Sequence, residues 1–391
     1  MGAHWLAWLA TALWCAVFVG VVVRFLDTRR LAEYAPVHGA DAPLVSVIIP
    51  ARNEARNIGR LLESLLASAY PSLEIIVVDD HSEDGTGDIA RAIAAAHPQA
   101  QLRVIDAPPL PDGWFGKQWA CQSGADAARG DILCFTDADT RHGPDLLGRS
   151  VGAMQARGAD LFTVAGHQEA GSFWEKVLQP FVFSILLSRY GGLEAMSRSM
   201  RPLDKIANGQ FVMMRRETYA SIGGHAAVRD HVAEDLRLAQ VVTARGLRAH
   251  MVLARDELST RMYTSLGELR RGWGKNVYAA GRDTLPLGAV SSRIFPWIFQ
   301  LPALVPLAPL VALLLWQLGV AGDGARIFGL VAGAFTFLYY AGVYAFSRLN
   351  PLWGLLYPLA AVTFSWICAE AAWRGSRVEW KGRGYVSRSA R

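Results

Sequence analysis

Two carboxylates one residue apart, Asp137 and Asp139, are the first residues in this sequence whose types and spacing suggest chemistry. The apolar run at 132–136 lies between them and a turn signal at 129–131, which predicts a buried strand of an α/β sheet. Ligands bind at the carboxyl ends of such strands. Two acids this close repel each other unless a divalent cation such as Mg or Mn lies between them with bound phosphate oxygens. We therefore interpret Asp139 and Asp137 as a clamp for a metal and a diphosphate, with a solvated turn as the alternative.

More acids follow the other strands that the sequence predicts. The expected strands are 45–50, 74–80, 102–107 and 132–137, and the expected helices between them are 58–68, 86–96 and 118–128. This alternation indicates an α/β fold with a mostly parallel sheet that is covered on both faces. Glu54, Asp79 and Asp80 lie at or after the ends of the first two strands, so several acids should share one edge, where a nucleotide would lie. Helix capping is the other explanation for Asp79 and Asp80.

Glu234 and Asp235 open a predicted amphipathic helix, where the helix dipole favours negative charge. A helix cap is one explanation for this pair. The other is catalysis, because transfer of a group from a diphosphate to a hydroxyl needs a carboxylate that takes the proton from that hydroxyl. Lys117 precedes another predicted helix and would contact the donor, unless it is solvated like most loop lysines.

The composition predicts a globular domain combined with membrane segments. With 391 residues and 52% hydrophobic composition, the chain is too apolar for a purely soluble enzyme, and its charges are too unevenly spread for a transporter with many spans. The expected parts are a transmembrane anchor at 1–30, a linker at 31–44, the globular domain at 45–285, a membrane region at 286–373 and a basic tail at 374–391.

The first apolar stretch, 5–23, is long enough to span a bilayer and lacks the features of a cleaved signal peptide. Arg24, Arg29 and Arg30 follow it, so the positive-inside rule places the globular domain in the cytoplasm. The formal net charge of +5, with many arginines in the tail, suits contact with a membrane surface better than binding of nucleic acid.

One N-terminal and two or three C-terminal transmembrane helices are expected, and the number depends on how one proline-rich segment is placed. Residues 327–346 and 352–373 have the composition of spans, whereas 294–318 contains four prolines and is expected to be re-entrant or interfacial. With two spans after a cytoplasmic domain, the basic tail returns to the cytoplasmic face. The apolar stretch at 172–189 is too short to span a bilayer and is either a buried helix or an interfacial helix that receives a lipid acceptor.

Taken in order, these residues resemble glycosyltransferase family 2, whose members have a GT-A fold. The resemblance covers residues 45–285 and rests on Pro50-Ala51-Arg52-Asn53-Glu54, Asp79-Asp80, Gly116-Lys117, Asp137-Ala138-Asp139, Asn208-Gly209-Gln210 and Glu234-Asp235. The sequence has no Walker A loop and no dinucleotide-binding glycine fingerprint after the first strand, so ATPase and dinucleotide oxidoreductase activities lose their main support.

The resemblance implies a role for each candidate residue. The donor-binding residues would be Pro50, Arg52, Glu54, Asp79, Asp80, Lys117 and Asp137, with Glu54 and Asp80 at the base and ribose. Asp139 and Asp137 would bind the metal. Asp235 would be the catalytic base, with Glu234 beside it. The acceptor site would contain Asn208, Gly209 and Trp273, although an interfacial anchor is another explanation for the tryptophan.

Within the family, Asp112-Gly113-Trp114, Gly272-Trp273 and the tail at 380–383 look most like hopanoid-biosynthesis-associated glycosyltransferases. The expected activity is inverting, metal-dependent transfer of a sugar from a nucleotide diphosphate sugar, a UDP-sugar first, to a hopanoid-type lipid hydroxyl at the inner membrane. Carotenoid, ceramide and polyprenyl-phosphate acceptors are alternatives. A catalytically silent membrane scaffold that binds nucleotide sugar is the alternative of another class, and the intact acid pairs speak against it.

Overall fold

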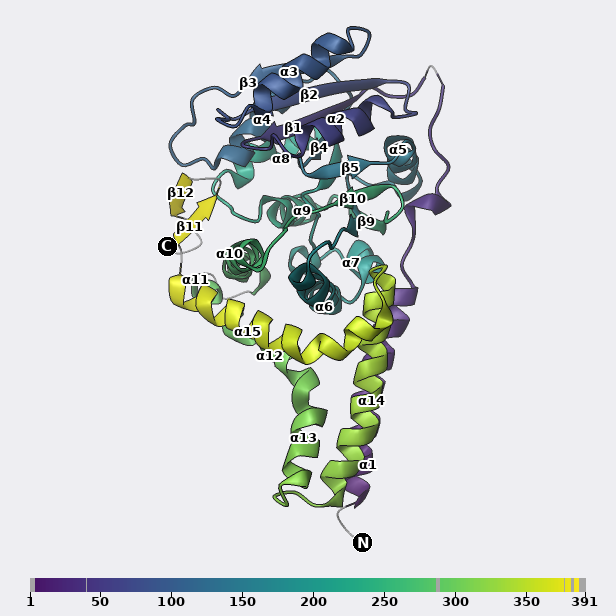
Figure 1. Cartoon of the computed structure of the whole chain (residues 1–391). Coiled ribbons are helices and arrows are strands. Elements are labelled where there is room, and N and C mark those ends of the chain that lie inside the picture. Colours follow the sequence, from purple (N-terminus) through teal and green to yellow (C-terminus); the bar gives the residue numbers. More distant parts are fainter. Residues whose placement is uncertain (1–3, 40, 286–288, 376, 381–382, 387–391) are drawn as a thin grey trace.

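The computed structural model describes residues 4–39, 41–285, 289–375, 377–380 and 383–386. An α/β part lies at one end, and three apolar helices extend away from it as a stalk (Figure 1). The helices of the α/β part surround its sheet, and a further apolar helix runs between the α/β part and the stalk.

A seven-stranded sheet forms the centre of the α/β part. Its strands, in spatial order, are β3 (Leu102–Asp106), β2 (Leu73–Asp79), β1 (Val45–Ala51), β4 (Ile132–Thr136), β8 (Phe211–Arg215), β6 (Leu161–Ala165) and β9 (Ala249–Leu253). Only β8 runs against its neighbours in this sheet, because both of its pairings are antiparallel and the other pairings are parallel. This mixed, mostly parallel GT-A-like sheet confirms the predicted fold class.

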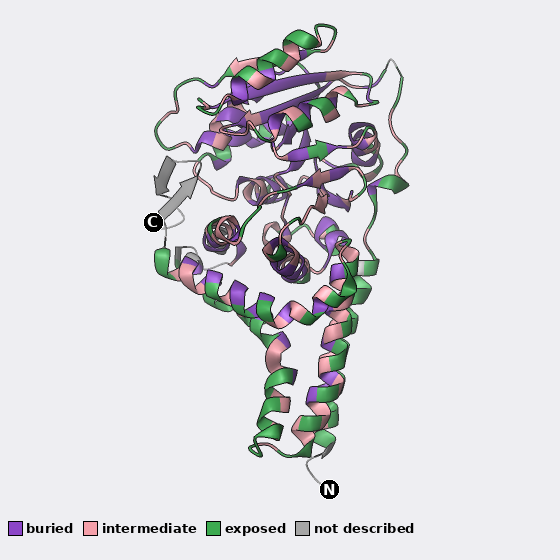
Figure 2. Ribbon diagram, viewed as in Figure 1, coloured by how far each residue is buried: buried purple, intermediate pink, exposed green. Residues whose placement is uncertain are grey.

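Alternate residues of β1 explain why the sheet is covered on both faces. Val47 and Ile49 belong to the apolar cluster that contains Leu61 of one helix, whereas Ile48 belongs to the cluster on the other face with Ala120. The covering helices are α2 (Ile58–Leu66), α3 (Thr86–Ala96), α4 (Gly116–Ala127), α5 (Leu146–Arg157), α8 (Arg216–Ile222) and α9 (Glu234–Ala244). Figure 2 shows the buried residues concentrated in this part of the molecule.

A second, three-stranded sheet lies below the carboxyl ends of the central strands. It contains β5 (Thr140–His142), β10 (Leu258–Thr260) and β7 (His167–Gln168), with β10 in the middle. Because β5 begins directly after Asp139, this sheet brings Gln168 and the segment after β10 towards the acids at the end of β4.

The stretch at 172–189 is a buried helix, which decides between the two alternatives. It forms α6 (Phe173–Tyr190), and Val177, Leu178 and Phe181 on it are fully buried. A capping box at Ser172 and Glu175 starts the helix, and Arg261 holds the buried carboxylate of Glu175 at 2.9 Å. Two further helices, α7 (Leu193–Arg198) and α10 (Leu266–Thr284), lie near it.

Four segments within the described residues are long and apolar enough to cross a membrane. They contain α1 (His4–Leu26), then α11 (Ala289–Ile298), α12 (Leu301–Leu304) and α13 (Ala308–Gln317), then α14 (Asp323–Phe346), and finally α15 (Tyr357–Arg374). One N-terminal and three C-terminal segments agree with the prediction of one anchor followed by two or three spans.

The four segments are not arranged alike. The stalk consists of α1, α13 and α14, which lie side by side, and α1 is fixed to α14 by a hydrogen bond from Trp14 Nε1 to Thr336 Oγ1. In contrast, α15 runs across the base of the α/β part (Figure 1), and Phe364, Ile367 and Cys368 on it are fully buried. The proline-rich segment expected to be re-entrant therefore supplies a stalk helix, whereas the segment 352–373 packs against the α/β part.

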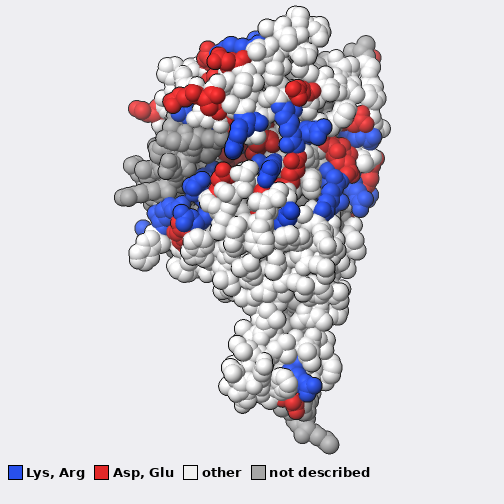
Figure 3. Space-filling view, viewed as in Figure 1, with Lys and Arg blue, Asp and Glu red and all other residues white. Residues whose placement is uncertain are grey.

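The outer surface of the stalk is apolar. Leu9, Leu13 and Val17 of α1 are exposed, and so are Leu314 of α13 and Leu330 of α14. Figure 3 shows charged side chains gathered on the upper part of the molecule, while this face of the stalk is almost free of them until its far end. A surface of this kind is typical of contact with lipid rather than water.

The N-terminal and C-terminal connections both adjoin the α/β part. The expected linker starts with the short helix η1 (Leu31–Glu33), in which Leu31 is fully buried, and Val37 bonds through its backbone N–H to the carbonyl of Gly148. After α15, the strands β11 (Arg377–Trp380) and β12 (Arg383–Val386) pair as an antiparallel hairpin. The hairpin lies at the level of the α/β part and not at the far end of the stalk (Figure 1).

Candidate active site

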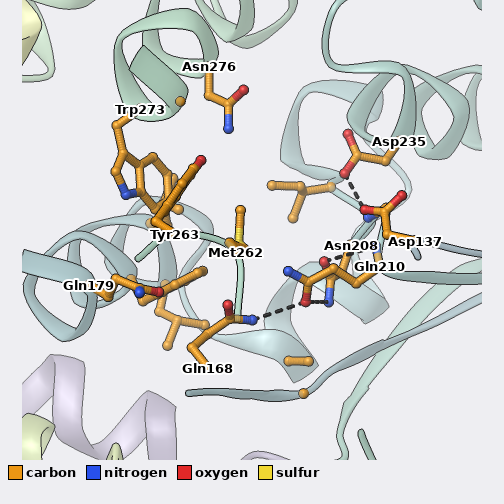
Figure 4. A pocket seen from close by; sticks show the side chains of 18 of the residues that line it. Asp137, Gln168, Gln179, Asn208, Gln210, Asp235, Met262, Tyr263, Trp273 and Asn276 are labelled. Atoms are coloured by element: carbon orange, nitrogen blue, oxygen red, sulfur yellow. Dashed lines mark hydrogen bonds between the residues drawn. The ribbon is translucent and has the colours of Figure 1, made fainter. Parts of the chain in front are cut away.

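A cavity of about 1600 Å³ lies between the central sheet, α6, α10 and the upper ends of α1 and α14. It exceeds the roughly 300–1,000 Å³ that is usual for one small ligand. At one end it is lined by acids, lysines and amides, and at the other by aliphatic and aromatic side chains. Figure 4 shows part of the polar region, where Asp137 and Asp235 lie on one side and Trp273 and Gln179 on the other.

Lys117 connects two of the predicted acids. It lies in the first turn of α4, and its Nζ is 2.7 Å from Asp137 Oδ1 and 2.7 Å from Glu234 Oε1. Burial alone would lower the pKa of Lys117, but attraction by Asp137 and Glu234 raises this pKa well above its usual value. The same ammonium group opposes the effect of burial on Glu234 and holds the pKa of that carboxyl below its usual value. Lys117 is therefore a charged centre of the site and not a solvated loop lysine.

Asp235 is held by two backbone N–H groups. Gly209 N donates to its Oδ2 at 2.7 Å, and Leu236 N donates to its Oδ1 at 2.7 Å. Burial and the neighbouring Glu234 raise the pKa of Asp235 to about 6, although Lys117 and the two N–H groups act in the opposite direction. A carboxylate that is fixed in position and titrates near neutral pH is suited to accept a proton.

Asp139 has the properties expected of an incomplete metal site. Its Oδ1 is buried and has no hydrogen-bond partner among the described residues. Burial, followed by repulsion from Asp137 and Glu54, raises the pKa of Asp139 to about 7. Burial also raises the pKa of Asp137, against the attraction of Lys117. An uncompensated buried acid of this kind fits a divalent cation, which binds carboxylate oxygens.

The residues alone do not complete such a site. Within the described part of the chain, no group of three or more His, Cys, Asp or Glu side chains is arranged to hold a metal ion. A cation held by Asp139 and Asp137 would therefore need oxygen ligands from a bound diphosphate or from water, as Mg²⁺ commonly has in phosphate-containing sites.

The predicted donor residues divide into two groups. Pro50, Arg52 and Glu54 line the cavity. Asp79 and Asp80 are buried beside it and are absent from the described residues that line it. Asp79 Oδ1 accepts a hydrogen bond from Ser82 N at 3.0 Å, in the turn before α3. This contact stabilises the turn that leads into the helix, so it resembles the capping role that was the alternative for Asp79.

Arg52 links these two groups. Its Nη1 donates to the backbone carbonyl of Asp80 at 2.5 Å and to that of His81 at 3.2 Å. Arg52 thereby fixes the segment after β2 next to Glu54.

The predicted acceptor residues all line the cavity. Asn208 and Gly209 lie in the segment before β8, and Trp273 lies on α10. The indole of Trp273 packs against Phe183 with ring centroids 5.6 Å apart, and its Nε1 is buried without a partner among the described residues. Trp273 is thus a wall of the cavity, which is inconsistent with an exposed interfacial anchor.

Several residues of the cavity could not be identified from the sequence. Gln168 Nε2 donates to Gln210 Oε1 at 3.0 Å, and Asn208 Nδ2 donates to the same oxygen at 3.2 Å, so three amides form a chain along the wall. Gln179 on α6 is buried, and neither of its amide atoms has a partner among the described residues. Figure 4 shows Gln168 and Gln179 on the same side of the cavity.

Lys275 on α10 also lines the cavity, and burial lowers its pKa although Glu234 and Asp137 act against this shift. No local motif marks Gln168 or Gln179. For Lys275, the sequence contained one indication of a place in the cavity, which is its position two residues after the predicted acceptor residue Trp273.

Comparison with known proteins agrees with this geometry. Residues 46–223 match the family model described as Glycosyl transferase family 2. A curated relative from Staphylococcus aureus strain MRSA252, 4,4'-diaponeurosporenoate glycosyltransferase, is 27% identical over 388 residues, which cover 97% of this chain and 98% of the relative. The protein of the same name from strain USA300 is 27% identical over 391 residues, with the same coverage.

Among solved structures, the chain is similar to the mannosyltransferase PcManGT from Pyrobaculum calidifontis in complex with GDP-Man and Mn²⁺. The TM-score is 0.54 and the identity is 22%, and the match covers 91% of this chain and 99% of the other. This likeness shows the fold. The curated relatives bear a name that denotes a carotenoid acid, so they support the alternative carotenoid acceptor better than the hopanoid acceptor that was favoured from the sequence.

Proposed function

We propose that this protein is a glycosyltransferase, which moves a sugar from a nucleotide diphosphate donor to a long apolar lipid, with a carotenoid-type acceptor favoured. One observation carries the proposal: the acids around Lys117 lie in the same cavity as an apolar region. This region, here called the apolar arm, is lined by Phe183, Leu187, Phe295 and Phe299. The apolar arm suits the chain of a lipid acceptor, and the acids suit the transfer of the sugar. A single cavity would therefore hold both the donor and the acceptor. The names of the curated relatives support the carotenoid class, and the hopanoid acceptor becomes one of the compounds to be tested.

In this proposal the donor lies along Pro50, Arg52 and Glu54, with its diphosphate near Asp139 and Asp137. A divalent cation bound there would screen the negative charge that develops on the leaving diphosphate.

Lys117 holds Asp137 and Glu234 close together and favours the ionised form of both carboxyls. The α/β part is placed on the cytoplasmic side, because Arg24, Arg29 and Arg30 follow the first apolar helix.

The acceptor oxygen forms a bond with the anomeric carbon of the sugar as the bond between that carbon and the diphosphate oxygen breaks. The nucleoside diphosphate leaves with the electron pair, and a single displacement inverts the anomeric configuration. For a hydroxyl acceptor, Asp235 takes the proton that the acceptor oxygen loses. A carboxylic acid acceptor is already ionised at neutral pH, so its attack on the sugar needs no base.

The test uses the purified full chain in lipid nanodiscs with labelled UDP-sugars and GDP-sugars. The acceptors compared are a carotenoid carboxylic acid, a carotenoid alcohol, a hopanoid alcohol, ceramide, a polyprenyl phosphate and water-soluble sugars. Transfer of one sugar to a carotenoid supports the proposal. Transfer only to soluble sugars, or a ladder of growing chains, would refute it.

The variant Asp235→Asn then distinguishes the two carotenoid acceptors. Its side chain keeps the size of aspartate but cannot take a proton. Transfer to the alcohol should fall by roughly 10²–10⁴-fold, and transfer to the carboxylic acid should fall much less. Equal losses with both acceptors would contradict the role of Asp235 as a base.

A further inference from the structure

The apolar arm of the cavity reaches the stalk. Val21 and Val22 of α1 and Leu338, Gly342 and Val343 of α14 line it. Further inside, the walls are the side chains of Phe183, Leu187, Phe295 and Phe299. The arm therefore passes from the candidate active site to the helices whose outer surfaces are apolar.

The arm is open where it meets the stalk. Val22 is 42% exposed and Leu338 is 63% exposed, although both also line the cavity. Gly342 lies next to them and is exposed, and a Cβ built on it would have no atom within 4 Å. Residues that belong both to the cavity wall and to the outer surface mark an opening.

Contacts between α1 and α14 close the stalk further from the α/β part. Trp14 bonds to Thr336, and the rings of Phe18 and Tyr339 are 4.8 Å apart. Because Val21, Val22 and Gly342 come later along these two helices, the opening lies between the closed part of the stalk and the α/β part. Arg24 also lines the cavity, one turn after Val21, where a chain leaving the bilayer meets the polar region.

We propose that this opening is a side portal to the bilayer, through which the apolar chain of the acceptor lipid enters and in which it stays during the reaction. The occupant is a single long apolar chain, such as a polyene or polyprenyl chain, and its reactive end points towards Asp235. This inference rests on the proposed function for the identity of the ligand as the acceptor, but the binding of such a chain can be measured without any sugar transfer.

A side portal removes a physical obstacle to the reaction. A long apolar chain that left the bilayer through water would expose every methylene group, which is strongly unfavourable. Movement between α1 and α14 exchanges lipid contacts for contacts with Val22, Leu338 and the deeper aromatic residues, so the chain never meets water. Only the polar end then enters the region of Gln179 and Trp273, whose buried polar atoms have no partner among the described residues.

Gly342 provides a sharp test because an added Cβ there meets no atom within 4 Å, so a large side chain would begin in open space at the portal. Gly342→Trp is compared with Gly20→Trp, which places the same side chain on an exposed glycine of α1. Gly20 also has no atom within 4 Å of an added Cβ and does not line the cavity. The two variants therefore differ only in whether the indole occupies the portal.

The probe is a 20-carbon polyprenyl alcohol with a diazirine group at its apolar end, added to nanodiscs that hold the full chain. After irradiation, peptide mass spectrometry locates the labelled residues. Labelling of Phe183, Phe295 or Phe299 in the wild type and in Gly20→Trp, with at least a tenfold loss in Gly342→Trp, would support the portal. Equal labelling of these inner residues in all three proteins, or labelling confined to the outer surface of the stalk, would overturn it.

Two control measurements separate this result from failure of the proposed function. Binding of UDP and GDP should be the same in both variants, and the thermal unfolding midpoints should lie within a few degrees of that of the wild type. If the probe labels the inner residues but no nucleotide sugar supports transfer, the portal stands and the proposed function falls.

Discussion

Lys117 Nζ lies 2.7 Å from Asp137 Oδ1, which joins the start of α4 to the end of β4. The same nitrogen lies 2.7 Å from Glu234 Oε1 at the start of α9. One ammonium group thus fixes the position of Asp137 relative to the helix that carries Asp235. In the proposed mechanism, this contact would couple donor binding to proton transfer.

Replacement of Lys117 by methionine should destabilise the fold, because Asp137 and Glu234 would lose the charge between them. The pair is partly exposed, so we expect a loss of about 1–3 kcal/mol at pH 8. At pH 5 the loss should be smaller, since protonation of the carboxyls relieves their repulsion. Thermal unfolding at both pH values measures this.

The matched control is Lys176→Met. The ammonium of Lys176 lies over the ring of Trp353 at 5.7 Å, so its removal should cost the same at both pH values. An equal loss at pH 5 and pH 8 for Lys117→Met would show that the lysine does not compensate the acids.

The pH dependence of transfer to a hydroxyl acceptor should report the environment of Asp235. Its pKa is raised to about 6, so kcat/KM should rise as the pH increases through this value and the base becomes ionised. In Glu234→Gln the repulsion from the neighbouring carboxylate disappears, and the rising limb should move to lower pH. The apparent pKa belongs to the coupled carboxylates as a group.

A pH–rate profile with Glu217→Gln as control tests this shift, because Glu217 is an exposed residue in the first turn of α8. In the control, the rising limb of the pH–rate profile should stay at the same pH as in the wild type. A limb that stays at the same pH in Glu234→Gln would mean that another group titrates.

Removal of divalent cations should abolish transfer, and Mg²⁺ or Mn²⁺ should restore it, if Asp139 supplies the unpartnered oxygen to a metal. Asp139→Asn should raise the Mn²⁺ concentration needed for half-maximal activity by at least tenfold. Electron paramagnetic resonance of Mn²⁺ in the presence of UDP or GDP provides a second readout. Full activity in excess chelator would exclude a metal at this site.

Gln179→Leu should separate a ligand contact from a structural role. Neither amide atom of Gln179 has a partner among the described residues, so its removal should not lower the thermal unfolding midpoint. The KM for the lipid acceptor should rise by about tenfold, the value of one lost hydrogen bond in a buried site, with little change in the KM for the donor. Gln155→Leu, at an exposed position on α5, is the control. An unchanged acceptor KM in Gln179→Leu would rule out this contact.

The tail should lie on the same side of the membrane as the α/β part. If α1, α13 and α14 cross the bilayer and α15 lies at its surface, one crossing separates the N-terminus from the α/β part and three crossings separate it from the hairpin β11–β12, so both lie on the same side. Reporters fused after Pro43 and after Arg391 should both be cytoplasmic, and one inserted after Gly322, between α13 and α14, should be external. An external reporter at Arg391 would show that α15 also spans.

The sequence by itself was sufficient for the local elements. Apolar runs with the right period predicted β1, β2, β3 and β4 and the helices between them to within two residues at each end. The alternation of strands and helices also indicated the α/β class, with several acids along one edge of a parallel sheet. The GT-A fold was implied by the resemblance to glycosyltransferase family 2. These features depend on neighbours in the chain, and a sequence displays such neighbours directly.

Only the tertiary structure decided which side chains share the cavity. Lys117 acquired its role from Asp137 and Glu234, which are remote from it in sequence, and Asp79 lies outside the cavity although it adjoins the same strand edge. Likewise, composition made 352–373 as plausible a span as 327–346, but α15 buries Phe364 and Ile367 against the α/β part. Packing between distant elements determines these outcomes, and the local periodicity of a sequence does not encode it.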